Sequence, residues 1–204
     1  MRSRDPDVCG LVLAAGAGRR FGSVKQLSSL AGRPLLEHAL AAMGHASVSR
    51  FAVVLGASAN EVAAGVDLHG AEPVVCAEWR EGQAASLRAG VEALDDPDAV
   101  VVTLGDQPLI STAAIDRVVA GRSPEADGAR ATYGGRPGHP VLLGRRLLDR
   151  VPGLRGDVGA RGLLADAELA PVPCDDVGQP TDVDTPEGLA EIERRLGAET
   201  GTSA

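Results

Sequence analysis

The sequence predicts an α/β fold, a Rossmann-like three-layer α/β/α domain around a mostly parallel, mixed sheet. Short apolar runs alternate with longer amphipathic segments, which is the pattern of strands followed by helices. The 204 residues fit one domain, and 44% of them are hydrophobic, enough for a sizeable core. With 2 Phe, 1 Trp and 1 Tyr beside 26 Gly, that core must be Ala, Val and Leu. We expect a single domain over 1–204, ordered from about 8 to about 196.

The first segments predict a strand, a helix and a second strand. Val8–Ala14 is a continuous apolar run, as in a strand that is buried on both faces. Residues 34–43 have the spacing of a helix, in which Pro34 suits the first helical position and Gly44 suits the stop. Phe51–Leu55 repeats the pattern of a buried strand.

The next segments continue this alternation. Ser58, followed three residues later by Glu61, predicts a capping box at the start of a second helix. Glu72–Cys76 predicts a short strand, and residues 83–94 predict an amphipathic helix. Ala99–Leu104 is the most strand-like segment of the chain, because it combines β-branched residues with a continuous apolar run.

The rest of the chain is less regular. The expected elements are a helix over 112–120, short strands near 129–133 and 140–143, a strand over roughly 169–174 and a helix over 186–196. The alternation demands a mainly parallel sheet with right-handed crossovers. Ligands of such sheets bind beyond the carboxyl ends of the strands, so the loops at those ends are the candidate site.

Composition excludes several classes of function. The chain carries 20 basic and 28 acidic residues, a net charge of −8, so we expect no general nucleic-acid binding, which needs a basic field. The apolar runs are too short to span a membrane, and the start shows no apolar signal segment. Cys9, Cys76 and Cys174 have no CxxC spacing and are expected to be reduced thiols. We therefore expect a cytoplasmic protein that acts on small molecules.

The loop after the first predicted strand has the composition of a phosphate-binding loop. Gly16 and Gly18 allow backbone N–H groups to converge on a phosphate. Arg19, Arg20 and Lys25 add positive charge to the same loop. The glycine spacing matches neither a Walker A motif nor GxGxxG. A plain glycine-rich turn is the alternative, but three basic residues in one loop of an acidic protein favour phosphate binding.

Carboxylates follow the fourth predicted strand and precede the last helix. Asp106 stands just past Ala99–Leu104, where its side chain would reach into the crevice. Asp182 and Asp184 lie before the helix over 186–196. Mg²⁺ prefers one or two carboxylates, with phosphate and water oxygens completing its octahedron. Each aspartate alone fits a turn or a helix start, and only their combination with the cationic loop predicts a magnesium site.

Two further segments carry candidate contacts. Gln83 and Ser86 stand at the start of the helix over 83–94, whose free N–H groups suit a base or a ribose, although simple helix capping is an equal alternative. Arg136 and His139 lie in a Gly- and Pro-rich loop that we interpret as a substrate loop. The other histidines are expected to be structural or solvated. No Ser/His/Asp or Cys/His set predicts covalent catalysis.

Taken together, these motifs resemble the MobA-like nucleotidyltransferases. LAAGAGRRFG with Lys25, then EGQAASLRAG, LGDQPL, RPGHPVLLG, GDVGAR and DVDTPEGL occur in the order found in that family, over about residues 8–196. The branch most similar to the sequence is that of the molybdenum cofactor cytidylyltransferases. The resemblance implies a Rossmann-like mixed sheet and Mg²⁺-dependent transfer of a nucleotide from an NTP to a phosphorylated, molybdopterin-type acceptor, with release of pyrophosphate. A recipient molybdoenzyme is a further implied partner.

The resemblance also assigns residues by position. Catalytic roles fall to Arg19, Lys25 and Asp106, of which Arg19 and Lys25 bind the phosphates. The nucleotide contacts are Leu13, Ala14, Ala15, Gly16, Gly18, Arg19, Lys25, Gln83, Ser86 and Asp106. The metal ligands are Asp106 and Asp184, the latter in preference to Asp182. The acceptor contacts are Arg136, His139 and Asp157.

The identity of the base follows from one side chain. The loop reads Leu-Ala-Ala-Gly, whereas guanylyltransferases of the family resemble Leu-Ala-Gly-Gly, so the methyl of Ala15 narrows the base pocket and favours CTP. Because aromatic residues are scarce, base recognition is expected to rest on backbone hydrogen bonds and on Ala15, without ring stacking.

Other functions remain open from the sequence. A guanylyltransferase, or a nucleotidyltransferase for a sugar or polyol phosphate, would use the same fold. An NAD(P)H-dependent or flavin oxidoreductase is the alternative of a different class, against which stands the missing GxGxxG. A non-catalytic carrier of molybdenum cofactor is a further alternative, and the presence of Asp106, Lys25 and Arg19 argues against it.

Overall fold

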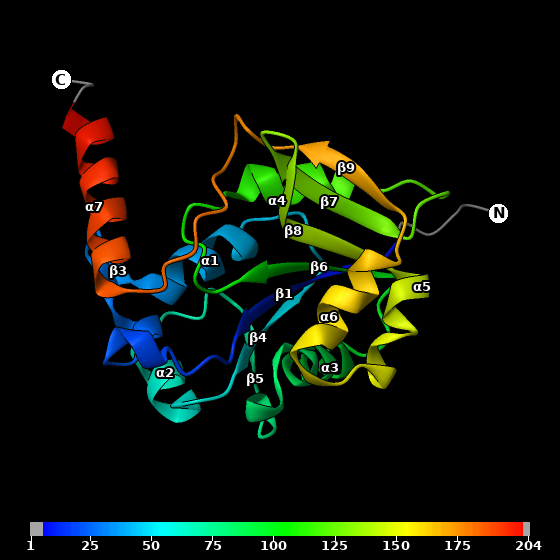
Figure 1. Cartoon of the computed structure of the whole chain (residues 1–204), viewed down its shortest axis with the longest axis horizontal. Helices are drawn as coiled ribbons and strands as arrows, with labels where there is room; N and C mark the ends of the chain where they lie inside the picture. The colour runs from blue at the N-terminus through cyan, green and yellow to red at the C-terminus, as the bar shows by residue number, and fades with distance from the viewer. Residues whose placement is uncertain (1–5, 202–204) are drawn as a thin grey trace.

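A seven-stranded sheet forms the centre of the molecule in the computed structural model, which describes residues 6–201 (Figure 1). Its strands are β1 Val8–Ala14, β4 Phe51–Leu55, β5 Glu72–Val75, β6 Ala99–Leu104, β7 Gly128–Tyr133, β8 Arg136–Gly144 and β9 Leu169–Pro173. Their order across the sheet is β5-β4-β1-β6-β8-β7-β9. The side chains of Arg19 and of residues 157–161 and 197–201 lie outside the described part.

The sheet is mixed and mostly parallel, as predicted. β4, β1 and β6 run parallel, and so do β5 with β4 and β9 with β7. Only β8 is reversed, pairing antiparallel with both β6 and β7. Leu13 of β1 pairs with Val54 of β4 and with Leu104 of β6, so the three central strands end at the same level. The loops that follow them therefore meet at one edge of the sheet.

Helices cover both faces, which confirms the three-layer architecture (Figure 1). They are α1 Leu35–Gly44, α2 Ala59–Gly65, α3 Gln83–Ala93, α4 Thr112–Ala120, α5 Arg145–Leu148, α6 Gly156–Ala165 and α7 Pro186–Gly201. Short 3₁₀ turns at Arg19–Phe21, Lys25–Leu27, Trp79–Glu81 and Val151–Gly153 connect them. One core joins α1, α2 and α4 to the sheet, and a second joins α3, α5 and α6 to its other face.

Both cores are aliphatic, as the composition predicts. Leu11 and Val54 on one face of the sheet and Val12 and Val53 on the other are fully buried. Each such side chain stabilises the fold by about 1.5–3 kcal/mol. Helix α3 packs close to the sheet because Gly90 has no side chain: a Cβ there would lie 2.4 Å from Leu11 and 2.8 Å from Val54. The three cysteines are buried and free of disulfides.

A small third core connects α7 to the segment after the glycine loop. Strands β2 (Ser29–Leu30) and β3 (Arg33–Pro34) form an antiparallel pair that the sequence analysis missed. Leu30 and Leu35 from this region pack with Val183 and Ile192, all buried. Val183 lies between the two candidate aspartates Asp182 and Asp184, so this packing determines where both of them stand.

Two details of the predicted helix starts are wrong. Pro34 belongs to β3 and precedes α1, which begins at Leu35. Ser58 has a left-handed backbone, with φ of 57°, and its side chain makes no capping hydrogen bond to α2. The left-handed conformation turns the Ser58 hydroxyl away from the geometry of a capping box, in which the capping residue is extended. Within the described residues, none of the helices is long and apolar enough to cross a membrane.

Candidate active site

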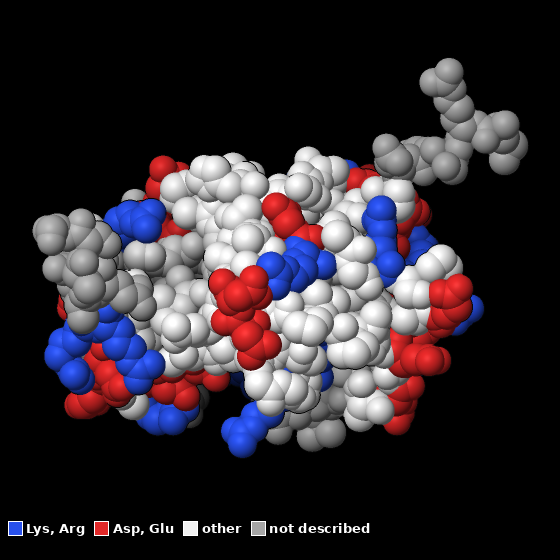
Figure 2. Space-filling model, turned by 90° about the horizontal axis from the view of Figure 1, so that it is seen from above, with Lys and Arg blue, Asp and Glu red and all other residues white. Residues whose placement is uncertain are grey.

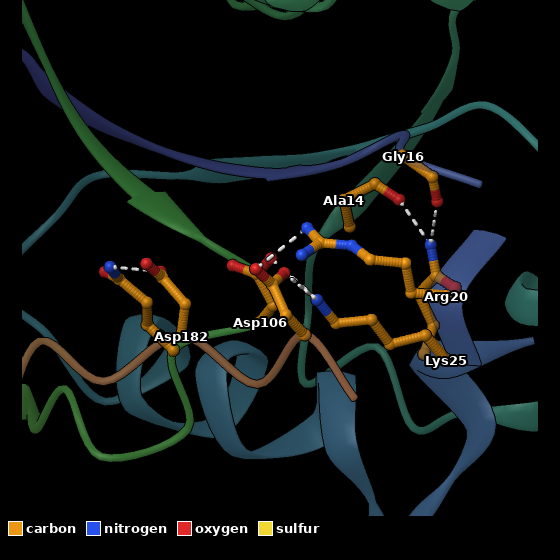
Figure 3. Close-up of polar contacts among 9 residues, drawn as sticks. Ala14, Gly16, Arg20, Lys25, Asp106 and Asp182 are labelled. Carbon is orange, nitrogen blue, oxygen red and sulfur yellow. Dashed lines mark hydrogen bonds and ion pairs between the residues drawn. The ribbon is translucent and has the colours of Figure 1, made fainter. Parts of the chain in front are cut away.

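The glycine loop between β1 and Lys25 forms one wall of a cavity of about 250 Å³ at the carboxyl ends of β1 and β6. Gly18 has a φ of 56°, and a Cβ there would lie 2.8 Å from Cβ of Lys25, so both conformation and space require glycine. Gln26 holds the loop in place: its Nε2 donates to the carbonyl oxygens of Ala14 at 2.8 Å and Gly16 at 2.9 Å (Figure 3). These contacts leave the loop's N–H groups available to a ligand.

Lys25 joins the two aspartates that were predicted to hold a metal. Its Nζ lies 2.9 Å from Asp106 Oδ2 and 3.4 Å from Asp184 Oδ1 (Figure 3). Arg20 reaches Asp184 from the solvent side, with Nη2 3.0 Å from Oδ2. Lys25 is buried, whereas Asp106 is one-third and Asp184 one-half exposed. The cluster therefore presents two accessible carboxylates around one shielded ammonium group.

Backbone hydrogen bonds bring these distant segments together. The N–H of Gly105 donates to the carbonyl of Leu13 at 3.0 Å, which ties the loop after β6 to the end of β1. The N–H of Val183 donates to the carbonyl of Asp106 at 2.9 Å. Asp184 thus reaches the cluster because its chain segment is bonded directly to that of Asp106.

Asp182 lies beside this cluster and faces another partner. Its Oδ1 accepts a hydrogen bond of 2.8 Å from Nε2 of Gln107, and burial raises the pKa of its carboxyl above the usual range. The Gln107 Oε1 is buried and has no partner among the described residues. The structure thus places Asp184, not Asp182, in contact with Lys25 and Arg20.

The carboxylates fit a divalent cation that shares its coordination with phosphate. Among the described residues no group of three or more His, Cys, Asp or Glu could hold a metal by itself. Asp106 and Asp184, however, contact one and the same ammonium group, so their oxygens converge on a small volume. Two carboxylates with phosphate and water oxygens match the donor set that Mg²⁺ accepts.

A second cavity, of about 670 Å³, adjoins the cluster on the other side of Asp106. Ala15, Gln83 and Ser86 line it, together with the glycine loop, as the positional assignments required. Trp79 and Arg80 line it too, and the Arg80 guanidinium lies 4.6 Å from the centre of the Trp79 ring. The single Trp of the chain thus stands at this wall, although base recognition is expected to need no ring stacking.

Of the residues predicted to contact an acceptor, the structure describes the side chains of His139 and Arg136. His139 lines a third cavity, of about 360 Å³, which adjoins the second one. Arg136 is exposed at the start of β8 and lines none of the three cavities. The side chains of Arg19 and Asp157 lie outside the described residues, so the structure places neither.

Sequence reasoning missed the roles of Gln26 and Trp79. Gln26 is a polar residue that folds back onto its own loop, and a single sequence carries no signal of such a contact. Trp79 stands in a polar segment just before α3, and its being the one Trp near the predicted nucleotide-binding helix was the available clue.

A glycine loop and Asp106 at the carboxyl ends of parallel strands, with Lys25 and Asp184 in contact beside them, are the features expected of a nucleotidyltransferase. The chain belongs to the MobA-like NTP transferase family, since the model of the MobA-like NTP transferase domain matches residues 10–172. This confirms the resemblance seen in the motifs.

Known proteins similar to this chain span nearly its whole length. Nicotine blue oxidoreductase of Paenarthrobacter nicotinovorans is 33% identical over 198 residues, covering 92% of this chain and 97% of the relative. The crystal structure of an Rv0371c homologue from Mycobacterium sp. strain JC1 is 30% identical, with a TM-score of 0.81 over 94% of this chain and 98% of the other. The manganese complex of Rv0371c from Mycobacterium tuberculosis is 27% identical, with a TM-score of 0.77 over 92% and 98%.

Proposed function

We propose that this protein transfers CMP from CTP to the phosphate of a molybdopterin-type acceptor, with Mg²⁺ as cofactor and pyrophosphate as the other product. One observation carries the proposal: the cluster of Lys25, Asp106 and Asp184 lines the 250 Å³ cavity, which shares Asp106 and the glycine loop with the adjoining 670 Å³ cavity. A nucleotide in that cavity would have its phosphates at the cluster. The Rv0371c structure, which is a complex with manganese, supports the use of a divalent metal.

The chemistry needs charge compensation more than proton transfer. The phosphate of the acceptor is already an anionic nucleophile, so a general base is not required. The barrier lies in bringing two anions together and in the charge that develops on the transferred phosphoryl group. When bound, Mg²⁺ would neutralise part of that charge and would be held by Asp106 and Asp184.

Lys25 and the loop supply the remaining positive field. The Lys25 ammonium is buried against the loop and so keeps a fixed position at the 250 Å³ cavity, where the phosphates would lie. Gly16 and Gly18 line the same cavity, and backbone N–H groups of such a loop can act as partial positive charges toward a phosphate. Such groups are arranged before the substrate arrives and need no reorganisation during reaction.

Ala15 supports the choice of CTP. Its side chain is buried and lines the 670 Å³ cavity, in which we propose that the base binds. An added methyl group in such a pocket excludes a purine more strongly than a pyrimidine. Hydrophobic pockets discriminate by about 1–3 kcal/mol per methyl-sized difference.

Substitution of Ala15 tests this choice. We expect Ala15→Gly to raise the kcat/KM for GTP relative to CTP by about 10-fold or more, because the lost methyl widens the base pocket. Steady-state pyrophosphate release with each NTP measures the ratio. Ala46→Gly, in the loop after α1 and away from the cavity, is the control, and an equal shift in both variants would remove Ala15 from base selection.

The function itself is tested by pyrophosphate release across NTPs and acceptors. CTP with molybdopterin should give the highest kcat/KM, above GTP and above sugar or polyol phosphates. A higher kcat/KM for GTP would replace the cytidylyltransferase with a guanylyltransferase. Since one relative is named an oxidoreductase, a parallel assay of NAD(P)H oxidation is included, and we expect no turnover in it.

A further inference from the structure

The third cavity contains an arginine that none of the assignments above uses. This cavity, of about 360 Å³, lies between the sheet and α6. It shares Leu13, Gln83 and Leu104 with the 670 Å³ cavity in which we propose that the nucleotide binds, from here on called the nucleotide cavity. A molecule in one cavity can therefore touch a molecule in the other. Its walls are mainly aliphatic, with Leu87 and Leu163 among them. Such walls suit the flat faces of a ring system.

Arg130 of β7 provides a positive charge in this apolar space. Its Nε donates to the carbonyl of Gly138 at 3.2 Å, and no carboxylate of the described residues forms an ion pair with it. Arg88 of α3, in contrast, reaches Glu81 at 3.5 Å. Burial lowers the pKa of the Arg130 guanidinium, since the charged form loses hydration. A cation held in such surroundings gains most from a ligand that brings hydrogen-bond acceptors.

His139 adds a neutral ring beside Arg130. Burial, and then the charge of Arg130, lower the pKa of His139 to about 4, so the imidazole is uncharged near neutrality. A neutral imidazole offers one donor and one acceptor. The hydroxyl of Tyr133 donates to the carbonyl of His139 at 2.9 Å and fixes the backbone at this point. Arg130 and His139 together form a polar edge on an otherwise apolar cavity.

We propose that this cavity binds the ring system of the second substrate, a flat heterocycle whose carbonyl or anionic edge accepts hydrogen bonds from Arg130 and His139. The inference rests on the proposed function, because it assigns the acceptor of that reaction to a position next to the nucleotide. It names Arg130 as the residue that recognises the acceptor, in place of the exposed Arg136.

The test measures the two substrates separately. Pterin, followed by the polarisation of its own fluorescence, reports on the third cavity, and the emission of Trp79 during a CTP titration reports on the nucleotide cavity. We expect the unaltered chain to bind pterin and Arg130→Met to bind it at least about tenfold more weakly, with CTP affinity unchanged. Arg195→Met, an exposed arginine on α7, is the matched control and should bind both ligands as the unaltered chain does.

Each outcome either supports or overturns the assignment of the third cavity to the acceptor. Equal pterin affinity in Arg130→Met and the unaltered chain, or no pterin binding by either, overturns the proposal. If Arg130→Met also loses CTP binding, Arg130→Lys is used instead; it keeps the charge but lacks the planar fork, and we expect weaker pterin binding with normal CTP binding. Pyrophosphate release from CTP and molybdopterin is assayed in parallel. Failure of that turnover alone, with Arg130-dependent pterin binding intact, rejects the proposed function and not this site.

Discussion

Lys25 and Asp106 form the central contact of the candidate active site, at 2.9 Å. Lys25 also contacts Asp184, at 3.4 Å, so removal of one carboxylate does not leave the buried ammonium group unpaired. The Asp106 oxygen that accepts the hydrogen bond from the N–H of Val183 belongs to the backbone, so substitution of the Asp106 side chain keeps this bond. Activity and stability are therefore separable at position 106.

The variant Asp106→Ala tests this separation. We expect turnover to fall by about a thousandfold or more, since the divalent cation loses one of its two carboxylates, while the circular dichroism spectrum stays that of the folded chain. Asp166→Ala, at an exposed site after α6, is the control and should keep its activity. Near-normal turnover of Asp106→Ala would remove Asp106 from the mechanism.

His139 predicts how stability depends on pH. Its pKa is about 4 in the folded chain and near 6.5 when unfolded, so between these values the unfolded chain binds more protons. Stability therefore rises as pH increases from about 4 to about 6.5 and is fully present above that, a contribution of up to roughly 3 kcal/mol. His38, whose pKa burial also lowers, acts in the same direction.

This contribution is measured by urea unfolding of His139→Asn and of the unaltered chain, at about pH 7 and about pH 5. The unaltered chain should lose more unfolding free energy on acidification than the variant, because only it must bury a neutral histidine. His38 is present in both and cancels. Equal losses would show that His139 is protonated as readily in the folded chain as in the unfolded one.

The sequence could indicate the site residues that stand at strand ends. Gly16, Lys25 and Asp106 follow β1 and β6, where parallel strands collect ligand contacts, and the structure brings them together. Asp184 was harder to place, because its position depends on the packing of Val183 and on a backbone hydrogen bond to Asp106. The role of Arg130 could not be predicted from the sequence, since the absence of a counter-ion among the described residues is visible only in three dimensions.

At the scale of elements, the close approach of α3 to the sheet determines the width of the nucleotide cavity. Gln83 and Ser86 begin this helix and line the cavity, while Gly90, two turns on, touches β1 and β4. If α3 moved outward, the cavity wall would move with it. The spacing at Gly90 thus connects the packing of the core to the site.

Substitutions of two helical glycines compare tight and open packing. Gly90→Ala should lower the free energy of unfolding by about 1–3 kcal/mol, because the fully buried Leu11 and Val54 would have to shift. Gly162→Ala in α6 meets no atom within 4 Å and should raise it by about 0.5–1 kcal/mol through helix propensity. Urea midpoints measure both. Equal stabilisation by the two substitutions would contradict the tight contact at Gly90.

The strands were predictable where they are continuous apolar runs in the sequence. β1, β4 and β6 match their predicted ranges residue for residue, because buried parallel strands are continuously apolar. The β2–β3 pair was missed because each strand has only two residues. The capping box predicted at Ser58 does not form, because the chain between β4 and α2 has a left-handed backbone conformation at this residue.

At the scale of the whole molecule, an acidic chain is proposed to bind two anionic substrates. On the face shown in Figure 2, basic and acidic side chains lie beside one another without a continuous field of one sign. At the site, Arg20 and Lys25 supply positive charge, each paired with an aspartate of the cluster. Net charge of −8 is thus compatible with phosphate ligands, because local groups and a divalent cation act at short range.

The most direct measurement is the mass of the acceptor after incubation of the protein with molybdopterin, Mg²⁺ and an equimolar mixture of CTP and GTP. We predict that the acceptor gains a cytidylyl group, that each product molecule is accompanied by one pyrophosphate, and that Asp106→Ala gives neither. An acceptor of unchanged mass, or one that carries chiefly a guanylyl group, would contradict this prediction.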